Sequence, residues 1–255
     1  MSIKNNKKLK VLLFILTLLL IFTGCEQAEE KEETAETKYD NGAFIAYSDA
    51  TEHGYAWAKI NLEDDDITEV KLMEVTSSGD HKDYDTYDYE ESVEAYEEMP
   101  GRFEEADSAD VDIYSGATDS SEKYIQAVDR ALKIAAGETE GDYFDGTFQG
   151  SSEEPSDYGY GIALVTFEDD NITEVELKEV DEEGEERDYS NEKYEDAVEA
   201  NEIMAERFEE NNSADVDTYT GATISSEKYI EAVEDALLHA GTARNNDEKE
   251  EDIKE

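Results

Sequence analysis

The chain has 255 residues, with 71 acidic side chains against 21 lysines and arginines, and its formal net charge is −50. This balance argues against nucleic acids and anionic lipid surfaces as partners, because both are bound through basic patches. One cysteine and three scattered histidines exclude an intrachain disulfide and do not predict a metal site, while an aromatic content of 10% argues against a fully disordered acidic chain.

The first 24 residues are predicted to be an export signal. Basic and polar residues 1–10 precede the apolar run VLLFILTLLLIF at 11–22, which is too short to span a membrane. The following FTGC segment resembles a lipobox, the processing site of bacterial lipoproteins, although Phe22 stands where an aliphatic residue is usual. The resemblance implies that Cys25 is acylated and becomes the new N-terminus. The alternative is an ordinary signal peptide with an incidental cysteine.

Residues 25–38 are acidic without apolar periodicity and are predicted to be a solvated tether, and residues 242–255 a similar acidic tail. The rest of the chain is one unit used twice. Residues 102–130 and 207–235, offset by 105, are identical at 21 of 29 positions. This internal repeat predicts two tandem domains, at 39–138 and 143–241.

Each unit is predicted to contain strands first and helices afterwards. Period-two alternation and Asp-rich turns indicate the strands, and apolar residues at helical spacing indicate the helices, with Val93, Tyr96 and Phe103 on one of them. Pro100 predicts that this helix is kinked or split. The order predicts an α+β fold of two tandem repeats, each a small antiparallel sheet packed by about two helices. The predicted strands of the first unit are 42–47, 55–62 and 67–75, and its predicted helices are 90–105 and 120–136; the second unit has a strand at 172–180 and helices at 191–210 and 225–240.

A small-residue turn separates the two predicted helices of each unit, DIYSGAT at 112–118 and DTYTGAT at 217–223. Glycine and alanine let a bulky group approach the backbone, and the following helix start offers unpaired N–H groups to a phosphate. The alternative is a helix cap rich in serine and threonine. Hydroxyl groups cluster there on Ser115, Thr118, Ser120, Ser121, Thr220, Thr223, Ser225 and Ser226.

Both units resemble the FMN-binding domain family almost end to end. The segments that carry the resemblance are DGTFQG at 145–150, a weaker copy NGAF at 41–44, NITEV at 171–175 and the two Asp-x-x-Ser/Thr-Gly-Ala-Thr turns, which match the family's flavinylation motif. The resemblance implies one FMN in phosphoester linkage to each of Thr118 and Thr223. A separate flavin transferase would install it, taking FMN from FAD with Mg²⁺. The first unit lacks the Asp-Gly start and carries Pro100, so its site has the weaker support.

The resemblance also implies roles for the other motif residues. Asp112 and Asp217 belong to the segment that the transferase reads. The bend around the phosphate would be formed by Ser115, Gly116 and Ala117 and by Thr220, Gly221 and Ala222. Tyr114, Tyr124, Tyr219 and Tyr229 stand near enough in sequence to flank the flavin ring, although core packing is the favoured role for Tyr124 and Tyr229.

These features predict a lipid-anchored protein on the outer face of the cell membrane that relays electrons from a membrane donor to an extracellular acceptor. We expect an electron carrier rather than an enzyme with its own substrate, without catalytic residues or a metal. The alternative is a surface binding lipoprotein that uses the same fold without flavin. A flavin-dependent reductase has no support, because neither a GxGxxG segment nor a Cys–His pair is present. The acidity suits a salt-loving or alkaline habitat or a basic partner, and Ca²⁺ at residues 64–66 is a weaker alternative.

Overall fold

The computed structural model describes residues 37–152, 159–181, 185–187 and 195–244. The predicted signal peptide, Cys25, most of the predicted tether and residues 245–255 of the predicted tail lie outside these ranges. Within the described residues, no helix is both long enough and apolar enough to cross a membrane.

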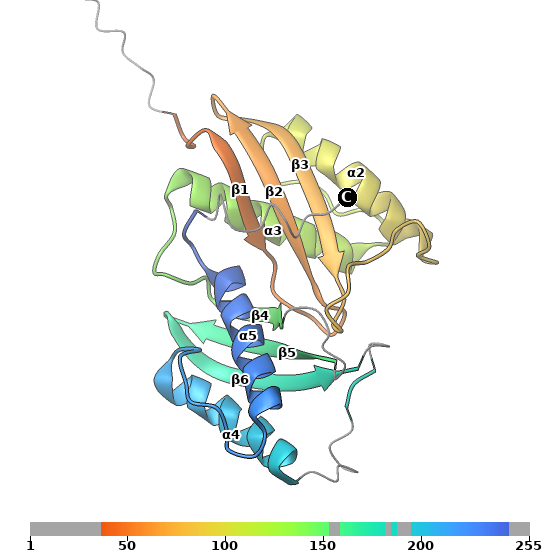
Figure 1. The fold of residues 1–255 in the computed structure, drawn as a ribbon. Helices are drawn as coiled ribbons and strands as arrows, with labels where there is room; N and C mark the ends of the chain where they lie inside the picture. Colours follow the sequence, from red (N-terminus) through yellow and green to blue (C-terminus); the bar gives the residue numbers. More distant parts are fainter. Residues whose placement is uncertain (1–36, 153–158, 182–184, 188–194, 245–255) are drawn as a thin grey trace, which may run out of the picture. The chain divides into compact units, whose positions relative to one another are not determined.

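Two three-stranded antiparallel sheets follow one another along the chain, and each is followed by two helices, which confirms the α+β prediction (Figure 1). Each sheet is a meander in which the second strand lies in the middle. The first sheet contains β1 (Gly42–Tyr47), β2 (Tyr55–Glu63) and β3 (Asp66–Val75), with helices α2 (Glu90–Ala106) and α3 (Thr118–Ala136). The second contains β4 (Gly146–Ser151), β5 (Tyr160–Glu168) and β6 (Asn171–Val180), with helices α4 (Glu195–Asn211) and α5 (Thr223–Ala240).

Aspartates form the tight turns between the second and third strands of both sheets. Asp64 and Asp65 have φ values of 52° and 75°, and Asp169 and Asp170 have values of 50° and 63°. Positive φ at both central residues is the geometry of a two-residue hairpin that matches strand twist, and aspartate adopts it more readily than most side chains. The predicted hairpins are therefore confirmed.

The middle strand of each sheet supplies the centre of its core. The alternating residues Ala56, Ala58, Ile60 and Leu62 of β2 have no exposed surface, as the period-two pattern predicts. Ala56 and Ala58 are small, and Tyr124 of α3 packs in the same core together with the larger Ile60 and Leu62.

The buried face of α2 lies one position away from part of the predicted stripe. Val93 and Tyr96 are only half-buried, and the core residues of this helix are Ser92, Ala95, Met99 and Phe103. The corresponding residues of α4 are Ala197, Ala200, Met204 and Phe208. Serine and alanine are too small to stand out in a hydrophobic pattern. The predicted apolar stripe was therefore placed on the larger neighbouring residues, Val93 and Tyr96.

Helix α2 continues through Pro100, so the predicted split does not occur, and the alternative of a kink stays a prediction. Proline removes one backbone hydrogen bond, to the carbonyl of Tyr96, and its ring crowds that carbonyl. The buried side chains Met99 and Phe103 pack into the core on either side of the proline and keep both halves on the sheet. The packing of these side chains therefore offsets the hydrogen bond that the helix loses at Pro100.

Two buried polar residues join the domains and have no counterpart across the repeat. The guanidinium of Arg130 donates to the carbonyl oxygens of Tyr47 and Asp145, at 2.8 and 3.0 Å, and pairs with Asp49 at 2.7 Å. The ring of His239 stacks on that of Tyr47, with centroids 3.9 Å apart. At an offset of 105, Arg130 corresponds to an aspartate and His239 to an isoleucine, so these contacts distinguish the two units.

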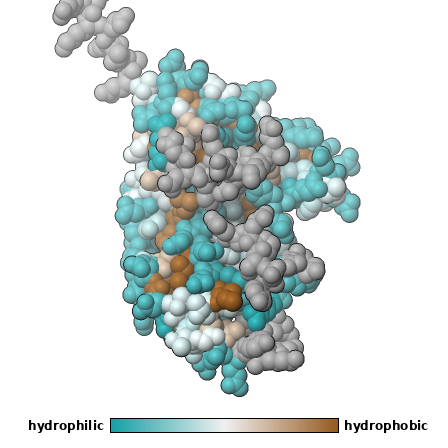
Figure 2. Space-filling view, viewed as in Figure 1, coloured by the Kyte–Doolittle hydropathy of each residue, from teal (hydrophilic) through white to brown (hydrophobic). Residues whose placement is uncertain are grey.

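The described atoms on the face in Figure 2 are mostly hydrophilic, with apolar atoms in small separate areas. This agrees with a chain in which 36% of residues are charged. Solvated charge of one sign keeps a protein soluble and weakens its folded state by self-repulsion at low salt.

Replacing Pro100 with alanine is expected to stabilise the first domain by about 1–3 kcal/mol, because it restores a helix hydrogen bond and removes the ring clash. The second domain has Ala205 at this position, so Ala205→Pro is the matched control and should destabilise by a similar amount. Thermal and urea unfolding of both variants measure the changes. A destabilised Pro100→Ala variant would show that the core requires the proline.

Candidate functional site

Each motif turn leads directly into the last helix of its domain. Thr118 is the first residue of α3 and Thr223 the first of α5, two residues earlier than the predicted helix starts. Both threonines are exposed. The motif therefore places a hydroxyl group at the first position of a long helix, where the backbone N–H groups have no intrahelical partner.

The helix starts are not capped by side chains, which argues against the capping alternative. The cap residues are Ala117 and Ala222, and neither helix has a side-chain hydrogen bond at its cap. Among the described residues, no hydroxyl group satisfies the first N–H groups, although the turn is rich in serine and threonine. The N-terminal ends thus remain open, with the positive end of the helix dipole directed at solvent.

The hydroxyl groups of the motif divide into an exposed set and a buried set. Ser115, Thr118, Thr220 and Thr223 are exposed, whereas the serine pairs that follow each threonine are buried. Ser121 locks the turn: its Oγ accepts from the N–H of Tyr114 at 2.9 Å and donates to the carbonyl of Ala117 at 2.7 Å. In the second domain, Ser226 makes the same two bonds, to Tyr219 and Ala222, each at 2.9 Å.

Glycine is required at the centre of each turn. Gly116 and Gly221 have φ values of +92° and +102°, a region that other residues rarely adopt. A Cβ atom on Gly116 would lie 2.8 Å from Cγ of Glu91, and one on Gly221 would lie 2.6 Å from a carboxylate oxygen of Asp196. The first residues of α2 and α4 therefore pack directly against the motif turns.

An arginine on the preceding helix holds the start of each motif. Arg102 donates to the carbonyl of Asp112 at 2.9 Å, and its guanidinium lies 5.2 Å from the ring centroid of Tyr114. Arg207 donates to the carbonyl of Asp217 in the same way. Sequence reasoning missed both arginines as site residues, although the RFEE block that contains them recurs at the offset of 105.

The hydroxyl of the tyrosine in each motif is held by a hydrogen bond to a glutamate carboxylate. The hydroxyl of Tyr114 donates to Glu94 at 2.7 Å, and this hydrogen bond raises the pKa of Tyr114 to about 12. The hydroxyl of Tyr219 donates to Glu199, which raises its pKa as well. The four tyrosines named from the sequence thus divide, because Tyr124 and Tyr229 have no exposed surface and serve the core.

The side chains of Asp112 and Asp217 extend from the surface. In the described parts of the chain, neither carboxylate has an ion-pair or hydrogen-bond partner, and their backbone carbonyls carry the contacts with the arginines. These two carboxylates are therefore accessible to another protein.

A buried carboxylate beneath each motif was not foreseen from the sequence. Glu74, near the end of β3, accepts from Lys123 at 2.7 Å, from Tyr124 at 2.9 Å and from Lys82 at 3.3 Å. Tyr84 also donates to it, at 3.2 Å. Burial alone would raise the pKa of Glu74, but the lysine ammonium groups and the hydrogen bonds outweigh it and hold the value at about 2.

The second domain repeats this cluster. Glu179, near the end of β6, accepts from Arg187 at 3.0 Å, from Lys228 at 3.1 Å and from Tyr229 at 3.2 Å. Burial again raises its pKa, while hydrogen bonds from Ser225 and Lys228 and the nearby positive charges lower it by more. The lysine and tyrosine come from the SSEKY block that begins one residue after the motif, so each cluster ties the threonine-bearing helix to the sheet.

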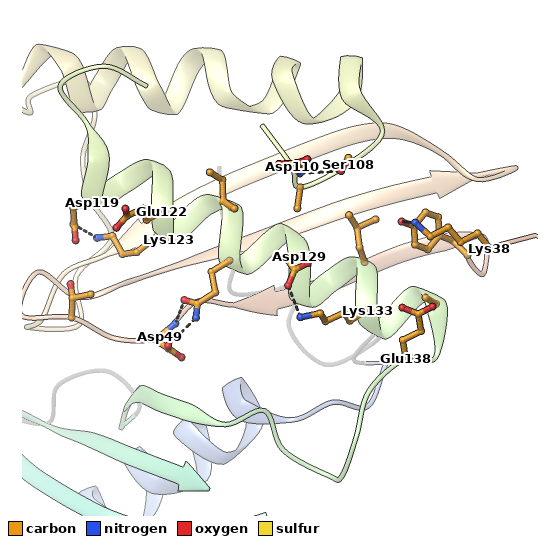
Figure 3. Close-up of a pocket in the computed structure, with 17 residues that line it drawn as sticks. Lys38, Asp49, Ser108, Asp110, Asp119, Glu122, Lys123, Asp129, Lys133 and Glu138 are labelled. Carbon is orange, nitrogen blue, oxygen red and sulfur yellow. Dashed lines mark hydrogen bonds and ion pairs between the residues drawn. The ribbon is translucent and has the colours of Figure 1, made fainter. Parts of the chain in front are cut away.

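A groove of about 790 Å³ runs along α3 and does not include Thr118 (Figure 3). The labelled carboxylates around it include Asp119, Glu122 and Asp129, and its lysines are partly paired, with Lys133 at 2.7 Å from Asp129. Its other walls come from the residues before β1, from the segment after β1 and from residues 108–110. The groove begins beside the motif and leads away from it, so it adds no group to the threonine site.

Replacing Glu74 with glutamine is expected to destabilise the first domain at neutral pH, because Lys82 and Lys123 would then lack their buried counter-charge. The pKa of Glu74 falls on folding, from 4.5 to about 2. Its contribution to the free energy of unfolding is therefore complete above about pH 4.5 and is lost as the pH falls towards 2. This pKa shift corresponds to a contribution of roughly 3 kcal/mol to the free energy of unfolding at neutral pH.

Urea unfolding of the wild type and of Glu74→Gln between pH 2 and pH 7 measures this dependence. The variant should lose stability at pH 7 and show a weaker decline in acid. The double variant Glu74→Gln/Lys82→Met, which removes an ammonium group that has no other carboxylate partner among the described residues, should recover part of the loss. Equal stability of the wild type and Glu74→Gln at pH 7 would contradict the role of Glu74 as the ionised partner of the two lysines.

Comparison with known proteins identifies one family whose model matches the sequence. The family model of the FMN-binding domain matches residues 24–133 and again residues 159–238, so each match contains one motif turn. A search of curated proteins found no match. Among solved structures, the CPE2226 protein from Clostridium perfringens is similar at 28% identity over 40% of this chain and 93% of that one, with a TM-score of 0.35. The two matches of the family model cover well over half of the sequence, and this chain therefore belongs to the FMN-binding domain family.

Proposed function

We propose that the chain is an electron carrier with one covalent FMN on each of Thr118 and Thr223. The observation that carries the proposal is the same in both domains: an exposed threonine hydroxyl stands at the first position of a helix whose N-terminal end has no side-chain cap. A binding protein of the same fold would have no need for this hydroxyl to be accessible.

The residues of each turn fit a phosphate linked to the threonine. Phosphate is favoured at a helix N-terminus, where N–H groups and the dipole face it. Because the cap positions are occupied by Ala117 and Ala222, no carboxylate or hydroxyl side chain competes for those N–H groups at the cap. Gly116 and Gly221 allow the positive φ of each turn and are covered by Glu91 and Asp196, so a bulky group would approach at the exposed threonine instead.

Attachment would require only a hydroxyl nucleophile from this chain. The threonine Oγ would bond to the FMN-side phosphorus of FAD, the bond to AMP would break, and the hydroxyl proton would leave to solvent. A flavin transferase with Mg²⁺ would provide the catalysis. Asp112 and Asp217, exposed at the start of each motif, are the residues we assign to recognition by that enzyme.

A covalent link suits a protein outside the cell. A non-covalent cofactor is lost on dilution, because occupancy depends on its concentration relative to the dissociation constant. Bound FMN supplies a ring that accepts and releases one or two electrons. The chain's own contribution would be to hold two such groups, one per domain, on a lipid anchor at Cys25, between a membrane donor and an extracellular acceptor.

Co-expression with a flavin transferase, followed by intact mass measurement, tests the attachment. The wild type should gain two FMN-sized increments, Thr118→Val and Thr223→Val one each, and the double variant none. Ser108→Ala, outside the motif, is the control and should keep both. An unmodified wild type in cells with an active transferase would contradict the proposal and leave a surface binding lipoprotein.

Electron relay is tested separately on membranes that contain the wild type or the double Thr→Val variant. With a reducing substrate for the membrane chain, the wild type should reduce a soluble extracellular acceptor and the double variant should not. Equal rates would mean that the flavins do not carry this current. Turnover of a soluble substrate by purified protein with NADH alone would instead favour a reductase.

The anchor is tested with Cys25→Ser. If Cys25 is acylated, the wild type should remain with the membrane fraction and the variant should be released or retain an uncleaved signal. Flavin loading of the released variant should be unchanged, because the motif turns are far from Cys25 in sequence. Membrane association that does not depend on Cys25 would contradict the anchor.

A further inference from the structure

Tyr89 lies across the motif turn of the first domain. It is the residue directly before α2, and its hydroxyl donates to the carbonyl of Gly116 at 2.6 Å. Nevertheless, 49% of its surface is exposed. Its backbone is fixed at the start of a helix and its hydroxyl at the turn, so the ring is held in place while remaining open to solvent.

The large apolar side chains that are exposed in the described residues gather around the motifs. Ile113 stands five residues before Thr118, and Ile224 directly follows Thr223. Tyr89 contacts the first motif, and Tyr87 belongs to the same segment as Tyr89. The exposed fractions of Ile113, Ile224, Tyr89 and Tyr87 are 45%, 52%, 49% and 43%. The other large apolar side chains of the described residues are buried or half-buried, so this exposure favours a contact with another group at each motif.

We propose that Tyr89 is the stacking partner of the flavin ring carried by Thr118. The inference rests on the proposed attachment of FMN to that threonine. The face of a tyrosine ring is electron-rich, and the isoalloxazine ring of FMN is electron-poor and planar, so the two favour stacked contact. A ring already ordered by its bond to Gly116 loses little further conformational freedom when it is covered.

The surrounding side chains leave Tyr89 as the best-placed aromatic group in this domain. Tyr124 is buried beneath the turn, and Tyr114 is half-buried with the guanidinium of Arg102 5.2 Å from its ring centroid. Tyr87 is exposed, but Lys82 lies over its ring with the ammonium 4.0 Å from the centroid. Tyr194 corresponds to Tyr89 at the offset of 105 and lies outside the described residues, so the proposal is confined to the first domain.

Stacking on tyrosine quenches flavin fluorescence, because the excited ring accepts an electron from the tyrosine. The test uses the full chain with Thr223→Val, so that only Thr118 carries flavin, and compares emission per bound flavin. Tyr89→Leu should increase emission several-fold. Tyr89→Phe, which keeps a ring but loses the readily oxidised phenol and the bond to Gly116, should also increase it. The control Tyr87→Leu should leave it unchanged.

Absorbance and intact mass give the flavin content, so the two proposals fail in different ways. Full loading of Tyr89→Leu with unchanged emission would overturn the stacking and leave the attachment intact. Absence of flavin on Thr118 in the parent would overturn the attachment, and the stacking with it.

A second measurement applies if Tyr89→Leu impairs loading. Nitration with tetranitromethane modifies exposed tyrosines, and peptide mapping locates the products. In the flavin-loaded parent, Tyr89 should be protected several-fold relative to the Thr118→Val form, whereas Tyr87 should react equally in both. Equal nitration of Tyr89 in the two forms would overturn the proposal.

Discussion

A buried carboxylate in each domain holds the threonine-bearing helix against the sheet. Glu74 and Glu179 lie near the ends of the third strands, and each accepts from a lysine five residues after the motif threonine, Lys123 or Lys228. Buried ion pairs of this kind often add little net stability, but losing one partner leaves an uncompensated charge. The pairing therefore fixes where the helix sits along the strand, and so where its first residue meets solvent.

The same clusters bring scarce basic side chains to the helix that bears each motif threonine. Basic side chains are few, yet two of them surround each buried carboxylate, Lys82 and Lys123 in the first domain and Arg187 and Lys228 in the second. In the first domain Lys123 also pairs with Asp119 at 3.0 Å, so the two lysines there face two carboxylates. For the phosphate proposed on Thr118, the helix N-terminus is therefore the favourable electrostatic feature, because the balanced cluster adds no net positive charge.

Local patterns predicted the strands, the hairpin turns and the motif position, because alternation, Asp-rich turns and small-residue motifs act over a few residues. The Glu74 cluster could not be predicted, since its carboxylate and lysine are 49 residues apart and only the fold brings them together. The predicted core stripe of α2 differed from the observed one because two of the buried residues, Ser92 and Ala95, are small. The repeat itself held an unused signal, since Glu74, Lys82 and Lys123 all have counterparts of the same charge at an offset of 105.

The most direct test of the account is peptide mapping by mass spectrometry of the chain isolated from its own cells. The account predicts FMN in phosphoester linkage on Thr118 and Thr223, the exposed first residues of α3 and α5. Modification of both threonines, with the neighbouring exposed hydroxyls of Ser115 and Thr220 unmodified, is the predicted result. Unmodified threonines in cells with an active flavin transferase, or FMN on another residue, would contradict it.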